Sequence, residues 1–203
     1  MDQFSEDDVR TALEPYHARI RSAVISGFAE WLSLAECRAA KGYAPVLYPR
    51  TISNYVFDAI ARCALTVFGS DPTVRIIDQA QTVKFCFGDV VIGRFKKGDE
   101  DNLGQNIRTQ AVLDFVDAQH SLPGLPPAAA KIEFIWTPDL LGSAVESVLV
   151  VARDGDNLLW SYEIDPGEPA TGAIPLPFQA APDDEPPLVT PKSLPSENET
   201  KGT

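Results

Sequence analysis

Apolar residues recur at helical spacing in the first third of the chain. Ser5 followed by Asp8 is typical of a capping box at a helix start. Pro15 predicts either a kink or a division into a short and a longer helix, because proline removes a helical hydrogen bond and clashes with the preceding turn. The apolar positions that keep one helical face are Val9, Leu13, Tyr16, Ile20, Val24, Phe28, Trp31 and Ala35.

A second helix is predicted after a break at Gly42–Pro49. Gly69 is expected to end it, since glycine is common just after the last helical turn. The apolar face of this helix is formed by Ile52, Val56, Ile60, Cys63 and Val67.

From Thr73 the apolar residues alternate with period two, which predicts strands. Three strands are expected at Thr73–Asp78, Thr82–Phe87 and Val90–Phe95, the last two joined by a turn at Gly88 and Asp89. One short helix follows, with apolar positions Ile107, Ala111, Val112, Phe115 and Val116. Three more strands are predicted near residues 130–137, 145–153 and 157–164, the last two joined at Asp154-Gly155-Asp156.

These elements predict an α+β fold, with N-terminal helices followed by a β-β-β-α-β-β-β, mainly antiparallel, sheet region. Residues 1–165 are expected to form a single domain, helical over 1–70 and sheet-rich over 71–165, in one sheet or two. Residues 166–203 hold nine of the 17 prolines and more acidic than basic side chains. Prolines at that density prevent helices and strand ladders, so this acidic tail is predicted to be disordered.

Composition narrows the classes of partner. The 203-residue chain has a formal net charge of −12, so no general attraction to nucleic acid or to an anionic membrane is expected. The acidic N-terminus and the absence of an apolar run of about 20 residues favour a cytoplasmic protein. Cys37, Cys63 and Cys86 lie in apolar surroundings without paired spacing, which predicts buried, reduced thiols.

A reversal of charge interrupts the pattern between the third strand and the following helix. Three basic residues, Arg94, Lys96 and Lys97, are followed by the acidic Asp99, Glu100 and Asp101. The neighbouring acids largely cancel the field of the bases, so direct nucleic-acid binding is not favoured. The segment is either a strand end and turn, with Asn106 or Thr109 capping the next helix, or a protein-binding surface. The binding residues in the second case are Arg94, Lys96, Lys97, Asn106, Thr109 and Gln110.

The predicted element order is similar to the α-β-β-β-α-β core of the PD-(D/E)XK nucleases, in which carboxylates and a lysine hold Mg²⁺ and activate a water. The residues depart from that motif. The position two before Lys96 is Arg94, and the position two before Lys97 is Phe95. A diverged site would have to use Asp78, Asp89 and Lys96 as catalytic residues, or recruit Glu30 or Glu36. No HExxH, CxxC, glycine-rich phosphate loop or G-x-S-x-G motif is present, and we predict no resident metal or cofactor outside this alternative.

Three segments carry a family resemblance: RFKKGDEDNLGQNIRTQAVLDF, LPGLPPAA and LLGSAVESVLVVARDGDNLLWSYEI. Together they resemble a family of small bacterial and prophage proteins encoded near ImmA/IrrE-type metallopeptidases and XRE-type repressors. The resemblance covers roughly residues 82–164 and brings no catalytic residue with it. It implies a toxin–antitoxin or phage-defence module in which one protein holds another inactive.

Two hypotheses follow from the sequence. The favoured one is a non-enzymatic, cytoplasmic interaction component whose partner is an ImmA/IrrE-type metallopeptidase or an XRE-type repressor. Its binding surface would be the segment Arg94–Asn106 or an exposed edge of the sheet. On this hypothesis, replacing Arg94 and Lys96 by alanine leaves the fold intact. The alternative is a toxin effector with the diverged nuclease-like site and Mg²⁺.

Overall fold

A computed structural model describes residues 5–79, 82–105, 109–118, 120–122 and 124–167. Residues 1–170 form one compact unit, and residues 171–203 form a second that lies outside the described ranges. The predicted disorder of the tail therefore concerns residues that are almost all outside the described part of the chain.

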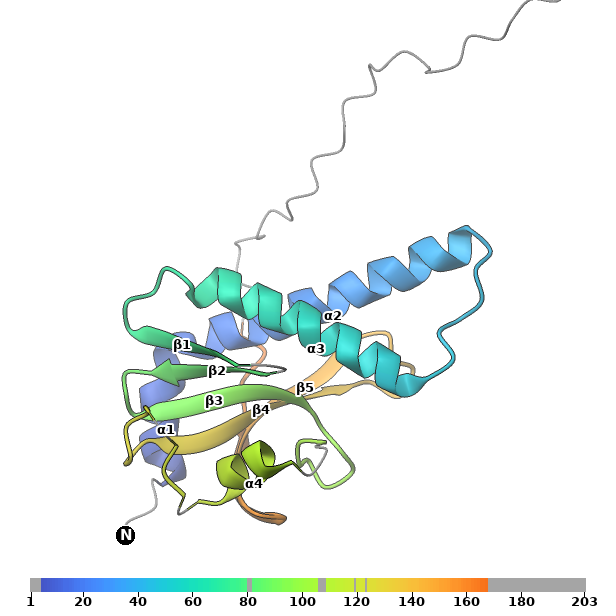
Figure 1. The fold of residues 1–203 in the computed structure, drawn as a ribbon. Coiled ribbons are helices and arrows are strands. Elements are labelled where there is room, and N and C mark those ends of the chain that lie inside the picture. The colour runs from blue at the N-terminus through green and yellow to red at the C-terminus, as the bar shows by residue number, and fades with distance from the viewer. Residues whose placement is uncertain (1–4, 80–81, 106–108, 119, 123, 168–203) are drawn as a thin grey trace, which may run out of the picture. The chain divides into compact units, whose positions relative to one another are not determined.

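Helices begin the compact unit (Figure 1). The predicted capping box is confirmed, because the Ser5 side chain accepts a hydrogen bond from the Asp8 backbone while the Asp8 side chain accepts one from the Ser5 backbone. Pro15 divides the first helical stretch instead of kinking it. The second predicted helix ends at Gly69, whose N–H donates to the Leu65 carbonyl. The bounds are α1 (Glu6–Leu13), the 3₁₀ turn η1 (Glu14–Tyr16), α2 (His17–Ala40) and α3 (Pro49–Phe68).

The six strands form a single sheet in chain order. They are β1 (Val74–Gln79), β2 (Thr82–Phe87), β3 (Val91–Lys97), β4 (Ala130–Pro138), β5 (Val145–Asp154) and β6 (Asn157–Glu163). Neighbouring strands are antiparallel except β3 and β4, which are parallel. A parallel pair needs a crossover connection, and this one contains α4 (Gln110–Val116). The predicted α+β class and mainly antiparallel sheet are confirmed.

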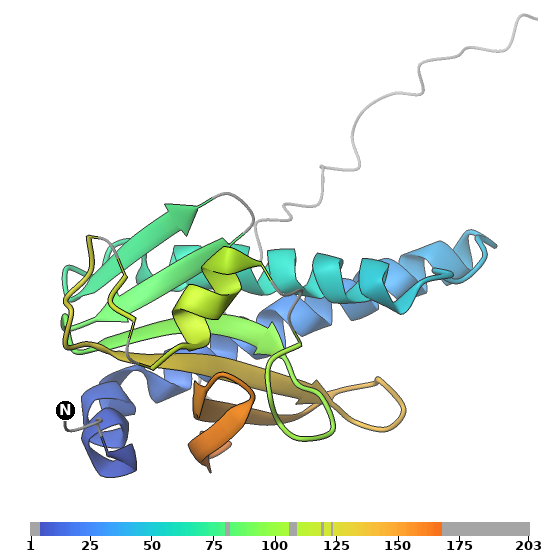
Figure 2. The same ribbon diagram turned by 60° about the horizontal axis from the view of Figure 1, so that its bottom comes forward.

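Helices cover both faces of the sheet. Figures 1 and 2 show α2 and α3 across one face and α4 on the other. Side chains alternate along β3, so that Val91 and Phe95 join the core beneath α2 and α3, whereas Ile92 packs with Phe115 of α4. The larger core is rich in aromatic rings, with Phe68, Phe85, Phe87, Phe95 and Phe134 in mutual contact.

The α2–α3 hairpin is longer than the sheet it covers. Its distal part, residues 29–55, contains no buried residue and is called the hairpin arm below. Trp31, Leu32 and Ile52 at its base still pack against the core, and both views show its far end extending past the sheet (Figures 1 and 2). The prediction that all three cysteines are buried is wrong for Cys37, which is exposed, because it lies on this uncovered part of α2. Cys63 is half-buried and Cys86 is buried.

None of the described helices is both long and apolar enough to cross a membrane.

Candidate functional site

Charged side chains are buried between the sheet and α4. Arg94 of β3 stands next to Glu133 in the parallel register with β4. Their side chains are only 3% and 1% exposed. Charged groups are rarely buried to this degree unless they are paired, so the site is defined by this pair.

The Arg94 guanidinium holds one carboxylate oxygen of Glu133 with two donors. Arg94 Nη2 lies 2.6 Å and Nε lies 3.0 Å from Glu133 Oε1. The guanidinium carbon also lies 4.1 Å from the centre of the Phe115 ring, so α4 covers the cation with an aromatic face. Burial lowers the pKa of Arg94, an effect that the negative charge of Glu133 partly offsets.

A second arginine reaches the other oxygen of the same carboxylate. Arg153 Nη1 lies 3.4 Å from Glu133 Oε2 and 3.4 Å from the Gly104 carbonyl oxygen, while its Nε donates to the Gly155 carbonyl at 2.7 Å. The Arg153 side chain is only 8% exposed. Glu133 therefore lies between two guanidinium groups, that of Arg94 buried and that of Arg153 at the edge of the buried region.

Further cations surround this arrangement. Lys84 on β2 is buried and Lys96 on β3 is half-buried. Burial lowers the pKa of both ammonium groups, and the positive charge of Arg94 lowers it further. Lys131 of β4 has another role, because its ammonium donates to the carbonyl oxygens of Asp114, Asp117 and His120 around the C-terminal end of α4.

The loop after β3 closes over the carboxylate. Gly98 and Gly104 form an antiparallel bridge, and Asp99 Oδ1 accepts hydrogen bonds from the backbone of Asp101 and Leu103. A Cβ at Gly104 would lie 2.6 Å from Glu133 Oε2, so a larger residue here would push the carboxylate away from its arginine donors. Asp99, the first of the acids after Lys97, thus shapes a turn.

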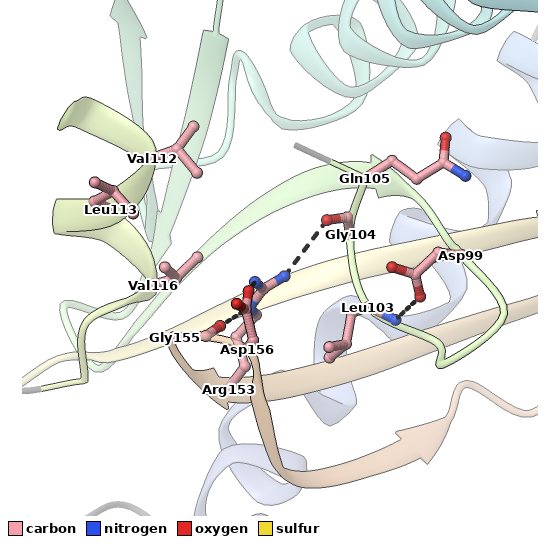
Figure 3. A pocket seen from close by; sticks show the side chains of 10 residues that line it. All are labelled: Asp99, Leu103, Gly104, Gln105, Val112, Leu113, Val116, Arg153, Gly155 and Asp156. Atoms are coloured by element: carbon pink, nitrogen blue, oxygen red, sulfur yellow. Dashed lines mark hydrogen bonds and ion pairs between the residues drawn. The ribbon is translucent and has the colours of Figure 1, made fainter. Parts of the chain in front are cut away.

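A cavity of about 420 Å³ opens beside Arg153 (Figure 3). One wall is apolar and comes from α4, and the opposite wall is the loop after β3 together with the β5–β6 turn. Asp156 lies 3.4 Å from the Arg153 guanidinium, and Asp99 adds a second carboxylate to the lining, so the cavity is not strongly basic. The lining residues are Asp99, Leu103, Gly104, Gln105, Val112, Leu113, Val116, Arg153, Gly155 and Asp156.

Three of the predicted binding residues, Arg94, Thr109 and Gln110, have local structural partners. Arg94 is buried, so it does not belong to an exposed basic surface, and its loss is expected to affect the fold. Thr109 caps α4, its side chain accepting from the Val112 backbone, and Gln110 donates to Asp114 at 2.6 Å. Lys97 is half-exposed at the end of β3. The prediction for Asn106 lies outside the described residues.

The structure does not bring together the residues of the nuclease alternative. Asp78 is paired with Val83, which packs beneath the helices, so Asp78 lies on the face opposite Arg94. Asp89 lies in the β2–β3 turn, at the other end of β3 from Lys96, and forms an ion pair with Arg75 at 3.1 Å.

The two helical carboxylates are also remote from that face. Glu30 of α2 is engaged with Arg62 and Tyr55 of α3, and Glu36 is exposed on the hairpin arm. Within the described ranges no three His, Cys, Asp or Glu side chains are grouped as a metal ion requires. The residues suggested for Mg²⁺ therefore do not fit it.

The sequence pattern could have indicated Glu133 but not its partners. It is the single acid inside the apolar run Ile132–Trp136, where an acid is expected to need a buried partner. Arg153 precedes a turn, and nothing in the sequence around it indicated that it would contact a buried acid.

A second candidate surface lies at the end of the α2–α3 hairpin. The residues between Cys37 and Thr51 are called the hairpin tip. Tyr43, Leu47 and Tyr48 of this tip are exposed by 61%, 79% and 55%. Leu140 and Leu141, in the β4–β5 loop, are also highly exposed. Both views place that loop at the same end of the compact unit as the hairpin tip (Figures 1 and 2).

Hydrogen bonds and ring contacts order the hairpin tip. Gly42 adopts a positive φ of 73°, and the Tyr43 N–H donates to the Arg38 carbonyl at 3.0 Å, which ends α2 in the way glycine allows. Arg38 also donates to the Ala44 carbonyl at 3.1 Å. Its guanidinium carbon lies 5.7 Å from the Tyr43 ring centre, and that of Arg50 lies 5.2 Å from the Tyr48 ring centre.

The fold and these two surfaces define a small α+β protein with a buried ionic cluster and a protruding helical hairpin. No protein-family model, curated protein or solved structure matches the chain.

Proposed function

We propose that the protein is a non-enzymatic, cytoplasmic interaction component of a bacterial toxin–antitoxin or phage-defence-like module. The observation that carries the proposal is the hairpin arm, a two-helix projection without a buried residue that ends in exposed Tyr43, Leu47 and Tyr48. Large apolar side chains grouped on a protruding surface are typical of protein–protein interfaces, in which tyrosine is enriched.

The arm is held in a defined shape, which favours recognition. Glu30 of α2 accepts hydrogen bonds from Tyr55 at 2.7 Å and from Arg62 at 2.9 Å, both on α3. Trp31 packs on Tyr55 with ring centres 5.8 Å apart. A preformed surface binds with a smaller loss of conformational entropy than a segment that must order on binding.

The ionic cluster is better explained as structure than as chemistry. Both oxygens of Glu133 face arginine donors, and the carboxylates suggested for a nuclease site lie on other faces or at other ends of the sheet. Catalysis by Glu133 would require it to release these donors. The cluster instead fastens β3, β4 and β5 to one another beneath α4.

The family resemblance supports a proposal for the class of protein to which the partner belongs. Proteins encoded near ImmA/IrrE-type metallopeptidases and XRE-type repressors belong to modules in which one protein restrains another, and a protruding arm suits that role. We therefore propose one of these two classes as the partner.

The experiment is capture of partners by the tagged, full-length chain in a bacterial host that encodes it. The variant Tyr43→Ser/Leu47→Ser/Tyr48→Ser, the apolar tip variant, removes the exposed side chains and should lose the partner. A matched control, Leu158→Ser/Leu159→Ser, removes exposed apolar side chains from β6 and should retain it.

The outcome can contradict the proposal in two ways. The first is that the chain is recovered without a stoichiometric partner. The second is that the apolar tip variant binds the partner as well as the wild type does. Either result would show that the hairpin arm is not the interface. Thermal unfolding of each variant shows whether it is folded, and we expect little change because the replaced residues are outside the core.

A further inference from the structure

We propose that the hairpin tip recognises a protein surface on which carboxylates surround an apolar pocket. This inference deepens the proposed function and rests on it.

The charge of the tip is opposite to that of the chain. The full sequence has 29 acidic and 17 basic side chains, yet the segment from Cys37 to Thr51 contains three bases and no acid. The three bases are Arg38, Lys41 and Arg50. A cationic projection on an otherwise acidic protein gives a specific orientation to an approaching acidic surface.

These cations are not neutralised within the described part of the chain. The ion pairs found there join none of the three to a carboxylate. Arg38 and Arg50 lie instead over the rings of Tyr43 and Tyr48. One nitrogen of Arg38 donates to the Ala44 carbonyl. A guanidinium has five N–H donors, so a guanidinium held beside a ring still has donors that can bind a carboxylate.

The centre of the tip is apolar. Leu47 is 79% exposed and lies in the loop between the two arginine–tyrosine pairs in the sequence. In the proposed complex Leu47 enters the pocket, and the arginines of the same loop meet its rim. Tyrosine and arginine, together with tryptophan, are enriched among the residues that carry most of the binding energy at interfaces. The arrangement fits an apolar pocket with an acidic rim.

A folded acidic protein fits the chain better than nucleic acid or a lipid surface. Long polyanions and anionic bilayers extend well beyond the three cations of the tip, so they would also meet the rest of the chain. Without the three bases of the tip, the rest of the chain is even more negative than the whole chain, whose net charge is −12. A protein can place a few carboxylates opposite the tip and none elsewhere. At physiological salt, charges further than about 8 Å apart are largely screened, so such a local match is sufficient.

The test compares two full-length variants with the wild-type chain. The charge-reversed tip variant is Arg38→Glu/Lys41→Glu/Arg50→Glu, and the apolar tip variant is the one defined above. Random 12-residue peptides displayed on phage serve as the defined probe, and the host partner is the second probe. We expect the wild type to enrich peptides with Asp and Glu around aromatic or aliphatic residues. The charge-reversed variant should recover at least about tenfold fewer phage that carry these peptides.

The outcomes separate this inference from the proposed function. If the apolar tip variant loses the host partner but the charge-reversed variant keeps it, the interaction function stands and the acidic partner is wrong. If neither variant loses it, the proposed function itself fails. Enrichment of basic or neutral peptides, or no enrichment that depends on the tip charges, would also overturn the inference.

Three further observations would reassign the tip. Tip-dependent binding of a 20-base-pair DNA duplex would indicate nucleic acid, and tip-dependent binding of phosphatidylglycerol vesicles would indicate a membrane surface. A dimer measured by light scattering that the apolar tip variant abolishes would indicate a second copy of the chain. Each of these results would replace the acidic protein partner.

Discussion

Glu133 is the residue around which the buried charges are arranged. Its two oxygens face Arg94 and Arg153 from neighbouring strands, and Gly104 leaves room for the carboxylate above them. Hydrogen-bonded charge pairs in a dry interior do not necessarily stabilise a protein, but removal of one partner leaves the other buried and uncompensated. The residue-scale expectation is therefore strong sensitivity to single substitutions here.

Arg94→Ala should lower the free energy of unfolding by about 3–5 kcal/mol, because Glu133 would stay buried without the two hydrogen bonds that Arg94 donates to it. Urea unfolding followed by circular dichroism measures the change. Lys97→Ala, at a half-exposed position on the same strand, is the control and should cost less than about 1 kcal/mol. Equal losses in the two variants would show that the buried pair has no special role.

At the scale of elements, Gly27 sets how closely α2 and α3 approach. A Cβ at this position would lie 2.5 Å from the Ile60 nitrogen and 2.7 Å from the Ile60 Cα. These are backbone atoms, so no side-chain rotation relieves the clash. The close contact lies where the two helices leave the sheet. In α2, Gly27 comes just before the first residue of the hairpin arm.

Gly27→Ala should therefore destabilise the protein by about 1–3 kcal/mol, although alanine is the better helix former, because the helices must separate. Ser33→Ala, at an exposed position of α2, should change stability by less than about 0.5 kcal/mol. Thermal or urea unfolding compares the two. A gain in stability for Gly27→Ala would mean that helix propensity outweighs the clash and that the approach is not tight.

For the whole molecule, His17 joins elements from opposite ends of the chain. Its Nε2 lies 3.0 Å from the hydroxyl oxygen of Tyr162, so the start of α2 is tied to β6. Burial lowers the pKa of His17, and the nearby positive charge of Arg10 lowers it further. Arg10 also lies over the Tyr162 ring, 4.1 Å from its centre.

The lowered pKa predicts a loss of stability on mild acidification. In the unfolded chain His17 takes up a proton as the pH falls through about 6.5, whereas the folded protein takes it up only at lower pH. The contribution of His17 is thus fully present above the unfolded pKa and is lost as the pH falls towards the folded pKa. The slope from this one group is at most about 1.4 kcal/mol per pH unit.

Urea unfolding at several pH values between about 7.5 and 5 measures this slope. His17→Gln removes the titrating group while keeping a polar side chain near Tyr162, and should flatten the dependence. The same slope in the variant and in the wild type would assign the pH dependence to other groups.

The sequence by itself determined the elements, because helices and strands follow from residues that are close together along the chain. The capping box at Ser5 and Asp8, the end of α3 at Gly69, the cap at Thr109 and the turn at Gly155 all depend on local hydrogen bonds and backbone angles. The predicted order of elements followed from the same patterns, and it was sufficient to predict the α+β class.

Tertiary structure alone decided where the charges and the exposed surfaces lie. Arg94 and Glu133 are 39 residues apart, and their contact depends on the parallel register of β3 and β4, which no local pattern specifies. The exposure of Cys37 and Leu47 depends on how far the sheet extends beneath α2 and α3. Amphipathic spacing shows that a helix has an apolar face, but only packing against a partner of finite length determines how much of that face is buried.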